Sequence, residues 1–222
     1  MSGIKQNLDE IRHELGGRAR LVAVSKNHPA EVILEAFNAG QLIFGENRVQ
    51  EILAKQPLVP SAIEWHMIGH LQSNKVRLIA PFISMIHSVD SLNLLSEISI
   101  QAIKSQRVID CLLQVFIATE ETKFGLDQEE LYDLLARIRK NPLPGVRIRG
   151  LMGMASFSDD TALVRLEFRG LKLLFDKVCS EFFIDEPHFN ELSIGMSGDY
   201  HLAIEEGSTL VRIGTKIFGS RY

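Results

Sequence analysis

The sequence predicts a (β/α)8 barrel, and three observations support this fold class. Apolar runs rich in valine, isoleucine and leucine alternate with helical patterns along the whole chain of 222 residues. Eight such runs can be counted, and several are apolar at consecutive positions, as in strands that are covered on both sides. No segment rich in proline or glycine interrupts the series, so we expect a single domain over residues 1–222. Eight β-α units in one domain favour a closed barrel over a doubly wound sheet, which is the alternative.

Each expected strand is a short apolar run followed by a polar or glycine-containing segment. The first, LVAVS, comes soon after the polar opening helix, and the fifth, VIDCLLQVFI, is the longest. In chain order, the eight expected strands are residues 21–25, 42–44, 63–68, 84–89, 108–117, 146–152, 188–193 and 209–213.

Each expected helix repeats apolar residues at helical spacing and has a recognisable beginning or end. An amphipathic helix opens the chain and ends near Leu15. Gly40 closes the second helix and Gly207 the last one, while Ser73 and Ser197 are expected to cap the helices that they begin. After the opening helix, the expected helices are residues 29–39, 47–55, 73–79, 91–105, 127–140, 160–179 and 197–205.

Composition and charge exclude several classes of function. The net charge is −4 and the 24 lysines and arginines are spread among acidic residues, so the chain lacks the basic patch of a nucleic-acid-binding protein. The N-terminal segment is polar, and no stretch approaches the ~20 apolar residues of a membrane span. We therefore expect a cytoplasmic protein. Cys111 and Cys179 are expected to be core residues without a disulfide.

Lys26 is the first candidate functional residue, because it ends the first expected strand. In a barrel of this kind the active site lies at the carboxyl ends of the strands, on the loops that follow them. An ammonium group at the mouth of a buried strand costs solvation free energy, and it is normally either ion-paired or lowered in pKa. The second outcome would make Lys26 a nucleophile that forms a Schiff base with a carbonyl compound.

Segments that contain glycine and serine or threonine follow the seventh and eighth strands, where barrels often bind phosphate. In SIGMSG, residues 193–198, the glycines let the backbone approach an anion and Ser197 offers a hydroxyl group. Gly214 and Thr215 offer the same groups from the neighbouring loop. Ordinary turns are the alternative, but two such loops at adjacent strand ends favour a phosphate site.

Arg212 helps to separate two kinds of ligand that carry both a phosphate and a carbonyl group. A sugar phosphate, the substrate of an aldolase, needs no arginine at this position on the eighth strand. Pyridoxal 5′-phosphate (PLP) has a pyridine nitrogen, which a facing arginine would keep unprotonated. A salt bridge inside the barrel is the alternative explanation of Arg212.

Six segments together resemble the pyridoxal phosphate homeostasis (PLP-binding) protein family, namely AVSK, FGENRVQE, WHMIGHLQSNK, RGLMGMAS, LSIGMSGDY and EEGSTLVRIGTKIFGSR. The resemblance covers residues 21–221 and implies an alanine-racemase-type barrel that carries PLP on the lysine of AVSK and has no established catalytic reaction. It implies that Lys26 forms the Schiff base, that Asn47 lies beside the ring and that Arg212 lies near the pyridine nitrogen. The residues expected around the phosphate are Ser197, Gly214 and Thr215.

Three further residues complete the expected cofactor site: His66, Met152 and Ser193. His66 would point into the barrel and pack under the cofactor, and a buried core histidine is the alternative. His66 and His70 have the spacing of a metal pair but lack an evident third ligand, so we expect no metal. The segment MGMAS from Met152 departs from the family, in which many members have threonine or alanine followed by Ile-Pro. Lys123 is either a solvated lysine or a secondary docking point for the cofactor.

The sequence therefore predicts a protein that binds PLP in intracellular PLP homeostasis and holds, buffers or delivers it, with apo PLP-dependent enzymes as candidate partners. A racemase-like enzyme acting on amino acids is the first alternative, but such racemases take a second acid or base from a C-terminal β domain and a partner subunit. The chain ends at Tyr222, directly after the eighth unit, so we expect a binding protein without catalytic residues. A sugar-phosphate aldolase is the second alternative. We expect a monomer, since a dimer needs an exposed apolar patch.

Overall fold

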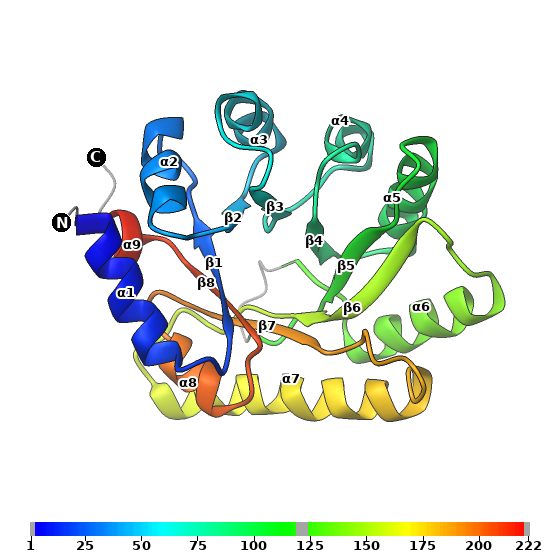
Figure 1. Ribbon diagram of the computed structural model, residues 1–222. Helices are drawn as coiled ribbons and strands as arrows, with labels where there is room; N and C mark the ends of the chain where they lie inside the picture. Colours follow the sequence, from blue (N-terminus) through cyan, green and yellow to red (C-terminus); the bar gives the residue numbers. More distant parts are fainter. Residues whose placement is uncertain (1–2, 119–123, 220–222) are drawn as a thin grey trace.

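Eight parallel strands form the centre of the protein. The computed structural model describes residues 3–118 and 124–219. The strands pair in chain order, and β8 pairs with β1, so the barrel is closed (Figure 1). This confirms the (β/α)8 barrel and excludes the open doubly wound sheet. The strands are β1 (Arg20–Val24), β2 (Ile43–Glu46), β3 (Glu64–Met67), β4 (Met85–Val89), β5 (Ile109–Gln114), β6 (Val146–Met152), β7 (Glu191–Met196) and β8 (Leu210–Ile213).

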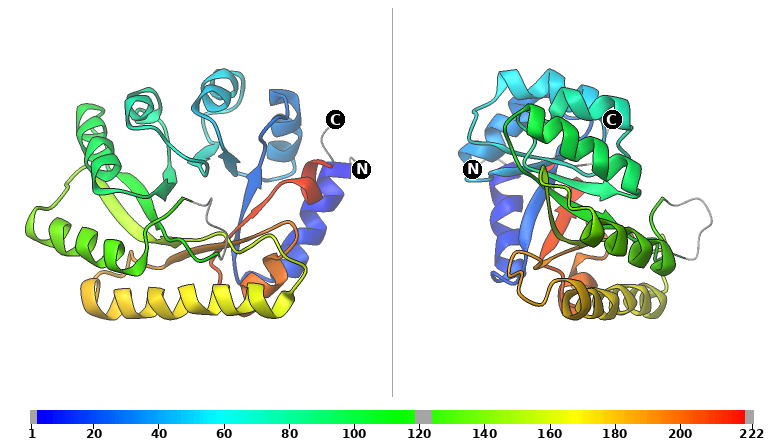
Figure 2. Two further views of the ribbon diagram at one scale, coloured as in Figure 1. Left: turned by 180° about the vertical axis from the view of Figure 1, so that it is seen from behind. Right: turned by 90° about the vertical axis from the view of Figure 1, so that its right-hand side faces the viewer.

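Helices surround the strands, as all views of the ribbon show (Figures 1 and 2). The opening helix, α1, packs against the last one, α9, where Asn7 Nδ2 donates a hydrogen bond of 2.9 Å to the carbonyl of Ile217. The α-helices are α1 (Gly3–Leu15), α2 (Ala30–Asn38), α3 (Val49–Lys55), α4 (Val76–Ile79), α5 (Leu92–Lys104), α6 (Gln128–Lys140), α7 (Thr161–Phe182), α8 (Tyr200–Glu205) and α9 (Thr215–Phe218). Two short 3-10 helices, η1 (Gln56–Leu58) and η2 (Ser73–Lys75), precede β3 and α4.

The seventh strand differs most from its predicted position. It covers Glu191–Met196 instead of residues 188–193, because Phe189 belongs to a turn and stacks on Phe183 with ring centroids 4.2 Å apart. The strand continues through SIGM, where its pairing with β8 shifts register between Ser193 and Met196. Gly195 has a φ of +92°, a conformation that favours glycine. Most of the segment predicted as a phosphate loop is therefore strand, and only Ser197 and Gly198 follow it.

Two predicted helix caps are wrong. The Ser197 hydroxyl does not cap α8, which begins at Tyr200, but accepts a hydrogen bond of 3.3 Å from the amide N–H of Gly214. Ser73 is the first residue of η2, and its hydroxyl accepts a 3.4 Å hydrogen bond from the Asn93 side chain. In both cases a tertiary contact takes the hydroxyl group that the local pattern assigned to a cap. The short helix α9 was not predicted.

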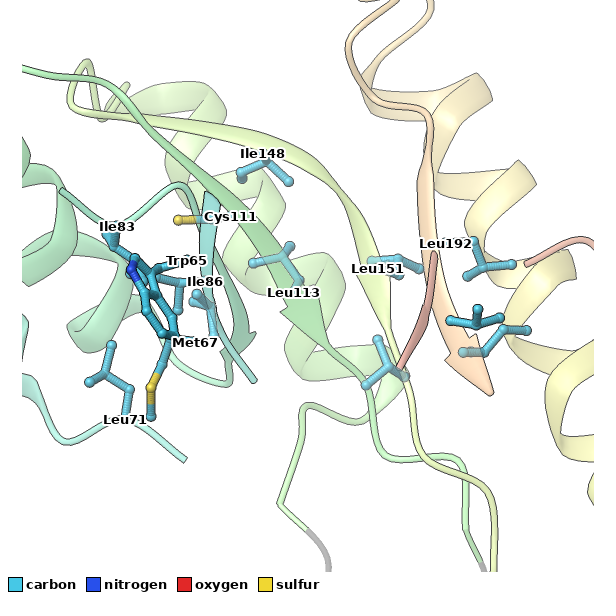
Figure 3. Packing of buried hydrophobic residues seen from close by; sticks show 14 of the residues in the cluster. Trp65, Met67, Leu71, Ile83, Ile86, Cys111, Leu113, Ile148, Leu151 and Leu192 are labelled. Carbon is cyan, nitrogen blue, oxygen red and sulfur yellow. The ribbon is translucent and has the colours of Figure 1, made fainter. Parts of the chain in front are cut away.

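The buried residues form two layers. The larger layer lies between the strands and the helices, and Figure 3 shows part of it, with Trp65, Met67 and Ile86 on one side and Leu113 and Leu151 on another. The smaller layer fills the barrel interior with the side chains of Val22, Met85, Leu112, Met152 and Leu210. This apolar layer lies beneath the residues at the carboxyl ends of the strands.

Of the two cysteines, one lies in the core and the other is only partly buried against it. Cys111 is fully buried, and burial raises the pKa of its thiol. Cys111 and Cys179 are both free cysteines. Among the described residues, no helix is long and apolar enough to cross a membrane.

Candidate functional site

A cleft of about 640 Å³ lies at the carboxyl ends of the strands. Residues from the ends of β1, β5, β7 and β8 and from the loops after β2, β3 and β6 line it. Its volume is in the range of small-molecule sites. Six of the nine predicted site residues line this cleft: Lys26, Asn47, Ser197, Arg212, Gly214 and Thr215.

Lys26 lies two residues beyond the end of β1 and is partly buried. Asn27, the next residue, has a φ of +64°, which is uncommon for a residue with a side chain. The chain turns at Asn27, directly after Lys26, and Lys26 itself lines the cleft. The structure thus places a primary amine where the sequence predicted it.

Arg212, on β8, is 4% exposed, and its hydrogen bonds go to neutral oxygen atoms. One guanidinium nitrogen donates to the carbonyl of Ser193 at 2.8 Å and to its hydroxyl at 2.6 Å, and the other donates to the carbonyl of Gly153 at 3.0 Å. Burial lowers the pKa of Arg212 to about 10, so the side chain is still a cation at neutral pH. Among the described residues, the groups that hydrogen-bond Arg212 are therefore neutral, while the Asp199 carboxylate acts on Arg212 only through its charge.

The hydrogen bonds of Arg212 continue across the barrel as a buried chain. The Ser193 hydroxyl lies 3.0 Å from Nδ1 of His87, and Nε2 of His87 lies 2.9 Å from Nδ1 of His66. The side chains of Arg212, Ser193, His87 and His66 are each at most 4% exposed. Burial lowers the pKa of His66 to about 3 and that of His87 well below its usual value, so both rings are neutral at pH 7.

Three predicted site residues lie below the cleft rather than in its lining. His66 and Ser193 belong to the buried hydrogen-bond chain, so His66 matches the core-histidine alternative. Met152 lies in the apolar layer of the barrel interior, while Met154, two residues further along, lines the cleft. Met152 is the last residue of β6, whereas Met154 lies in the loop beyond it, where the alternation of the strand no longer applies. His87, which the sequence analysis did not select, connects the two predicted residues.

The apolar part of the cleft lining was also missed. Phe124, Met154, Phe157 and Met196 line the cleft, and the Phe157 side chain is 98% exposed. Nothing in the alternation of strands and helices distinguishes these residues from ordinary loop residues. Lys123, which precedes Phe124, lies outside the described residues.

One close backbone approach shapes the cleft wall beside Asn47. A side-chain carbon added at Gly69 would lie only 2.4 Å from the carbonyl oxygen of Asn47. Only glycine allows the loops after β2 and β3 to approach each other so closely. The next residue, His70, faces the same cleft, and its Nδ1 lies 3.4 Å from a carboxylate oxygen of Asp90. His66 and His70 thus have different partners, and among the described residues no three His, Cys, Asp or Glu side chains are grouped as metal ligands.

A second cavity, of about 510 Å³, is lined mostly by apolar residues, which come from β6, from α5, α6 and the end of α7, and from the loops beside them. None of the predicted site residues lines it. We therefore take the cleft at the carboxyl ends of the strands as the candidate site.

The donor set of the cleft fits a phosphorylated aldehyde with a heteroaromatic ring. Lys26 supplies an amine that can react with a carbonyl group. The hydroxyl groups of Ser197 and Thr215, with glycine backbone on either side, suit a phosphate group, and Arg212 supplies a buried cationic donor. The Gly214 N–H is already bonded to Ser197. A phosphate would therefore meet the hydroxyl groups first.

Comparison with known proteins assigns a family. The sequence matches the family model described as "Alanine racemase, N-terminal domain" over residues 1–222. The pyridoxal phosphate homeostasis protein of Aquifex aeolicus (strain VF5) is 44% identical over 204 residues, which are 91% of this chain and 87% of that protein. PipY of Synechococcus elongatus PCC7942, solved with PLP bound, is 38% identical with a TM-score of 0.89 over 97% of this chain and 100% of that one.

A less similar protein of known structure has the same barrel fold. Alanine racemase from Bartonella henselae, solved with covalently bound pyridoxal phosphate, is 16% identical with a TM-score of 0.72. The match covers 98% of this chain and 58% of the racemase chain, so the two share the barrel fold. With a family model matched along its whole length, this chain belongs to the alanine racemase N-terminal domain family.

Proposed function

We propose that the protein binds PLP through a Schiff base on Lys26 and acts in intracellular PLP homeostasis, where it holds, buffers or delivers the cofactor. The observation that carries the proposal is the convergence in one cleft of Lys26, the buried Arg212 and the hydroxyl groups of Ser197 and Thr215. The names of the similar proteins and the PLP bound to PipY support the same ligand. In this proposal residues 1–222 act as one binding domain.

The proposed roles follow from the chemistry of each residue. Bound PLP would supply an aldehyde that reacts reversibly with amines and a pyridine ring that can withdraw electrons when it is protonated. The hydroxyl groups of Ser197 and Thr215 would hold the phosphate, with the backbone of Gly214 beside it, and Asn47 would lie beside the ring. Arg212 is cationic at neutral pH and has only N–H donors, so it would donate to the pyridine nitrogen and keep it unprotonated. His66, Met152 and Ser193 would support the ring from below.

We propose that the protein is not a catalyst, because an unprotonated pyridine ring is a weak electron sink. The racemase alternative requires the ring to stabilise a carbanion, which the cationic Arg212 disfavours. The expected result is negligible racemisation or transamination of common amino acids. A turnover near the ordinary enzyme median of about 10 s⁻¹ would contradict this part of the proposal.

Borohydride reduction followed by mass measurement and peptide mapping tests the PLP proposal. Purified protein with added PLP should gain the mass of one pyridoxyl phosphate group on Lys26, because reduction makes the Schiff base permanent. Lys26→Ala should lose this modification and the associated visible absorbance. If the label spreads equally over surface lysines in the wild type, the assignment to Lys26 is wrong. Reduction with a sugar phosphate in place of PLP tests the aldolase alternative.

The remaining parts of the proposal concern partners and location. Apo PLP-dependent enzymes are the proposed acceptors, and recovery of activity of an apo-enzyme mixed with the loaded protein measures the transfer. The cytoplasm is the proposed compartment, since both described cysteines are free thiols, as is usual in a reducing environment. The expected monomer stays a prediction that sedimentation velocity can test. Lys123 stays a proposed secondary docking point for the cofactor, tested by mapping the label in Lys26→Ala.

A further inference from the structure

A buried lysine that does not line the cleft lies behind the Lys26 turn. Lys55, the last residue of α3, is 8% exposed. Its ammonium group donates to the carbonyl of Ser25 at 2.9 Å, to Oε1 of Glu46 at 2.7 Å and to Oε2 of Glu51 at 2.9 Å. An ammonium group has three N–H donors. All three are used within this group.

The two carboxylates that bind Lys55 also hold the two residues adjacent to Lys26. The Ser25 hydroxyl donates to Oε1 of Glu46 at 2.7 Å, and the amide N–H of Asn27 donates to Oε2 of Glu51 at 2.7 Å. The backbone is therefore bonded to one ionic group immediately before and immediately after the lysine.

This ionic group is costly for the fold. Glu46 is fully buried, and among the described residues its Oε2 has no hydrogen-bond partner. Burial raises the pKa of Glu46, whereas hydrogen bonds from Asn27 and Lys55 outweigh the effect of burial on Glu51 and lower its pKa. Buried ion pairs are often no more stabilising than apolar residues of the same volume. Stability alone therefore does not explain two carboxylates and an ammonium group at this position.

The turn itself shows what the ionic group does. Asn27 adopts a left-handed conformation with a φ of +64°, which costs free energy for most residues with a side chain and less for asparagine. Two hydrogen bonds hold the turn. The N–H group of Asn27 donates to Glu51, and the amide N–H of His28 donates at 3.1 Å to the carbonyl of Ser25, which Lys55 also binds. Without the bond to Glu51, only the hydrogen bond between His28 and Ser25 would hold the turn, and Lys26 would be less firmly fixed in the cleft.

We propose that Glu46, Glu51 and Lys55, here called the Lys55 clamp, position Lys26 for attack on the bound aldehyde. This inference rests on the proposed function. In the step concerned, Lys26 Nζ forms a bond to the aldehyde carbon, and the aldehyde oxygen leaves as water with two protons from the amine. The clamp residues do not touch the aldehyde and act through the backbone on both sides of Lys26. They are positioning residues, and they govern the rate of attachment rather than the binding of the phosphate and ring.

Variants of Glu51 separate positioning from general damage. Glu51→Ala removes the acceptor for Asn27, whereas Glu51→Gln keeps a carbonyl oxygen that can accept the same bond. Asp176→Ala is the matched control, because Asp176 pairs with Lys172 at the same i,i+4 spacing on α7, away from the cleft. Lys55→Met tests the centre of the clamp, and its unfolding curve shows whether it folds.

Two measurements are made on each variant. The first is the rate of covalent attachment of PLP, followed by absorbance and borohydride trapping. The second is the affinity for 4′-deoxypyridoxine 5′-phosphate, which lacks the aldehyde. We expect Glu51→Ala to slow attachment between about tenfold and a hundredfold, as for a misplaced reacting group, with the analogue affinity within about twofold of wild type. Glu51→Gln and Asp176→Ala should attach PLP at about the wild-type rate.

A reaction independent of PLP distinguishes failure of the clamp from failure of the proposed function. Reductive methylation with formaldehyde and cyanoborohydride, mapped by mass spectrometry, reports the reactivity of Lys26 relative to the other lysines. If the wild type attaches no PLP but Glu51→Ala still lowers the methylation of Lys26, the proposed function is wrong and the positioning role of the clamp is supported. Equal attachment and methylation rates in Glu51→Ala and wild type would overturn the clamp. So would a loss of analogue affinity in proportion to the attachment rate.

Discussion

The buried hydrogen-bond chain under the cleft makes Ser193→Ala the most informative substitution for stability. The Ser193 hydroxyl accepts a 2.6 Å hydrogen bond from Arg212 and lies 3.0 Å from Nδ1 of His87. A guanidinium group can only donate, so the hydroxyl keeps its own proton to donate to His87. Alanine removes the acceptor of a cation and leaves a buried ring nitrogen without a partner.

The expected cost follows from these two losses. A hydrogen bond to a charged group contributes about 1.5–3 kcal/mol, and an unsatisfied buried polar group costs about 1–3 kcal/mol. The carbonyl of Ser193 still accepts from the same nitrogen of Arg212 at 2.8 Å, which reduces the first loss. We therefore expect Ser193→Ala to lower the free energy of unfolding by about 2–4 kcal/mol. For a chain of this length, the melting temperature should fall by roughly 4–16 °C.

Urea unfolding without added PLP measures this effect, with Ser208→Ala as the matched control. Ser208 is also a buried serine between β7 and β8, but its hydroxyl donates only to backbone carbonyl groups, at 2.8 Å to Ile194 and 3.0 Å to Leu210. Loss of such a neutral hydrogen bond should cost about 0.5–1.5 kcal/mol. If the two variants are equally stable, with unchanged dependence on urea, then the chain from Arg212 to His87 does not stabilise the barrel as argued.

Two further predictions concern pH and the cleft wall. Because burial lowers the folded-state pKa of His66 and His87, the unfolded chain binds protons below about pH 6.5 that the folded chain does not. The contribution of these two histidines should thus be constant above this pH and fall as the pH decreases, by about 2 kcal/mol for His66 at pH 5 and by a further amount for His87. Unfolding of His87→Gln should show a smaller decrease, and an identical pH profile would contradict the prediction. Gly69→Ala should cost about 1–3 kcal/mol, because the added carbon would lie 2.4 Å from the carbonyl oxygen of Asn47. Gly198→Ala, with no atom within 4 Å of the added carbon, should change the unfolding free energy by less than about 0.5 kcal/mol.

The sequence predicts those parts of the site that follow directly from strand ends. Lys26, Arg212 and Gly214 were placed correctly because the carboxyl ends of parallel strands meet at one face of a barrel. The seventh strand was predicted to end at Ser193, because the irregular pairing of β7 and β8 near Gly195 carries the strand three residues further than the apolar pattern indicates. The alternation of buried and exposed residues is a poor guide to where a strand ends, because backbone irregularities shift the pairing register there.

Contacts across the barrel could not be predicted. His87 lies within the run MIHSV, where its neighbours indicate only a buried strand, and its partners come from β3 and β7. Lys55 lies at the end of an amphipathic helix, where a lysine is usually solvated. Its burial depends on the ion pair with Glu46, which lies on β2, the strand that precedes α3. Contacts such as Lys55–Glu46 form only when helices and strands pack together. The spacing of apolar residues along the sequence does not predict them.

The partners of the two buried cations explain why one belongs to the candidate site and the other does not. Two carboxylates surround Lys55 and at least balance its charge, and the group acts on the backbone that it binds. The hydrogen bonds of Arg212 go to two carbonyl groups and a hydroxyl group, and beyond the hydroxyl lie two neutral histidines. A carboxylate in place of Ser193 would hold Arg212 equally firmly but would cancel its charge. Neutral partners fix the position of the guanidinium group and leave its charge to act on whatever occupies the cleft, which is the property that a binding site for an anionic ligand requires.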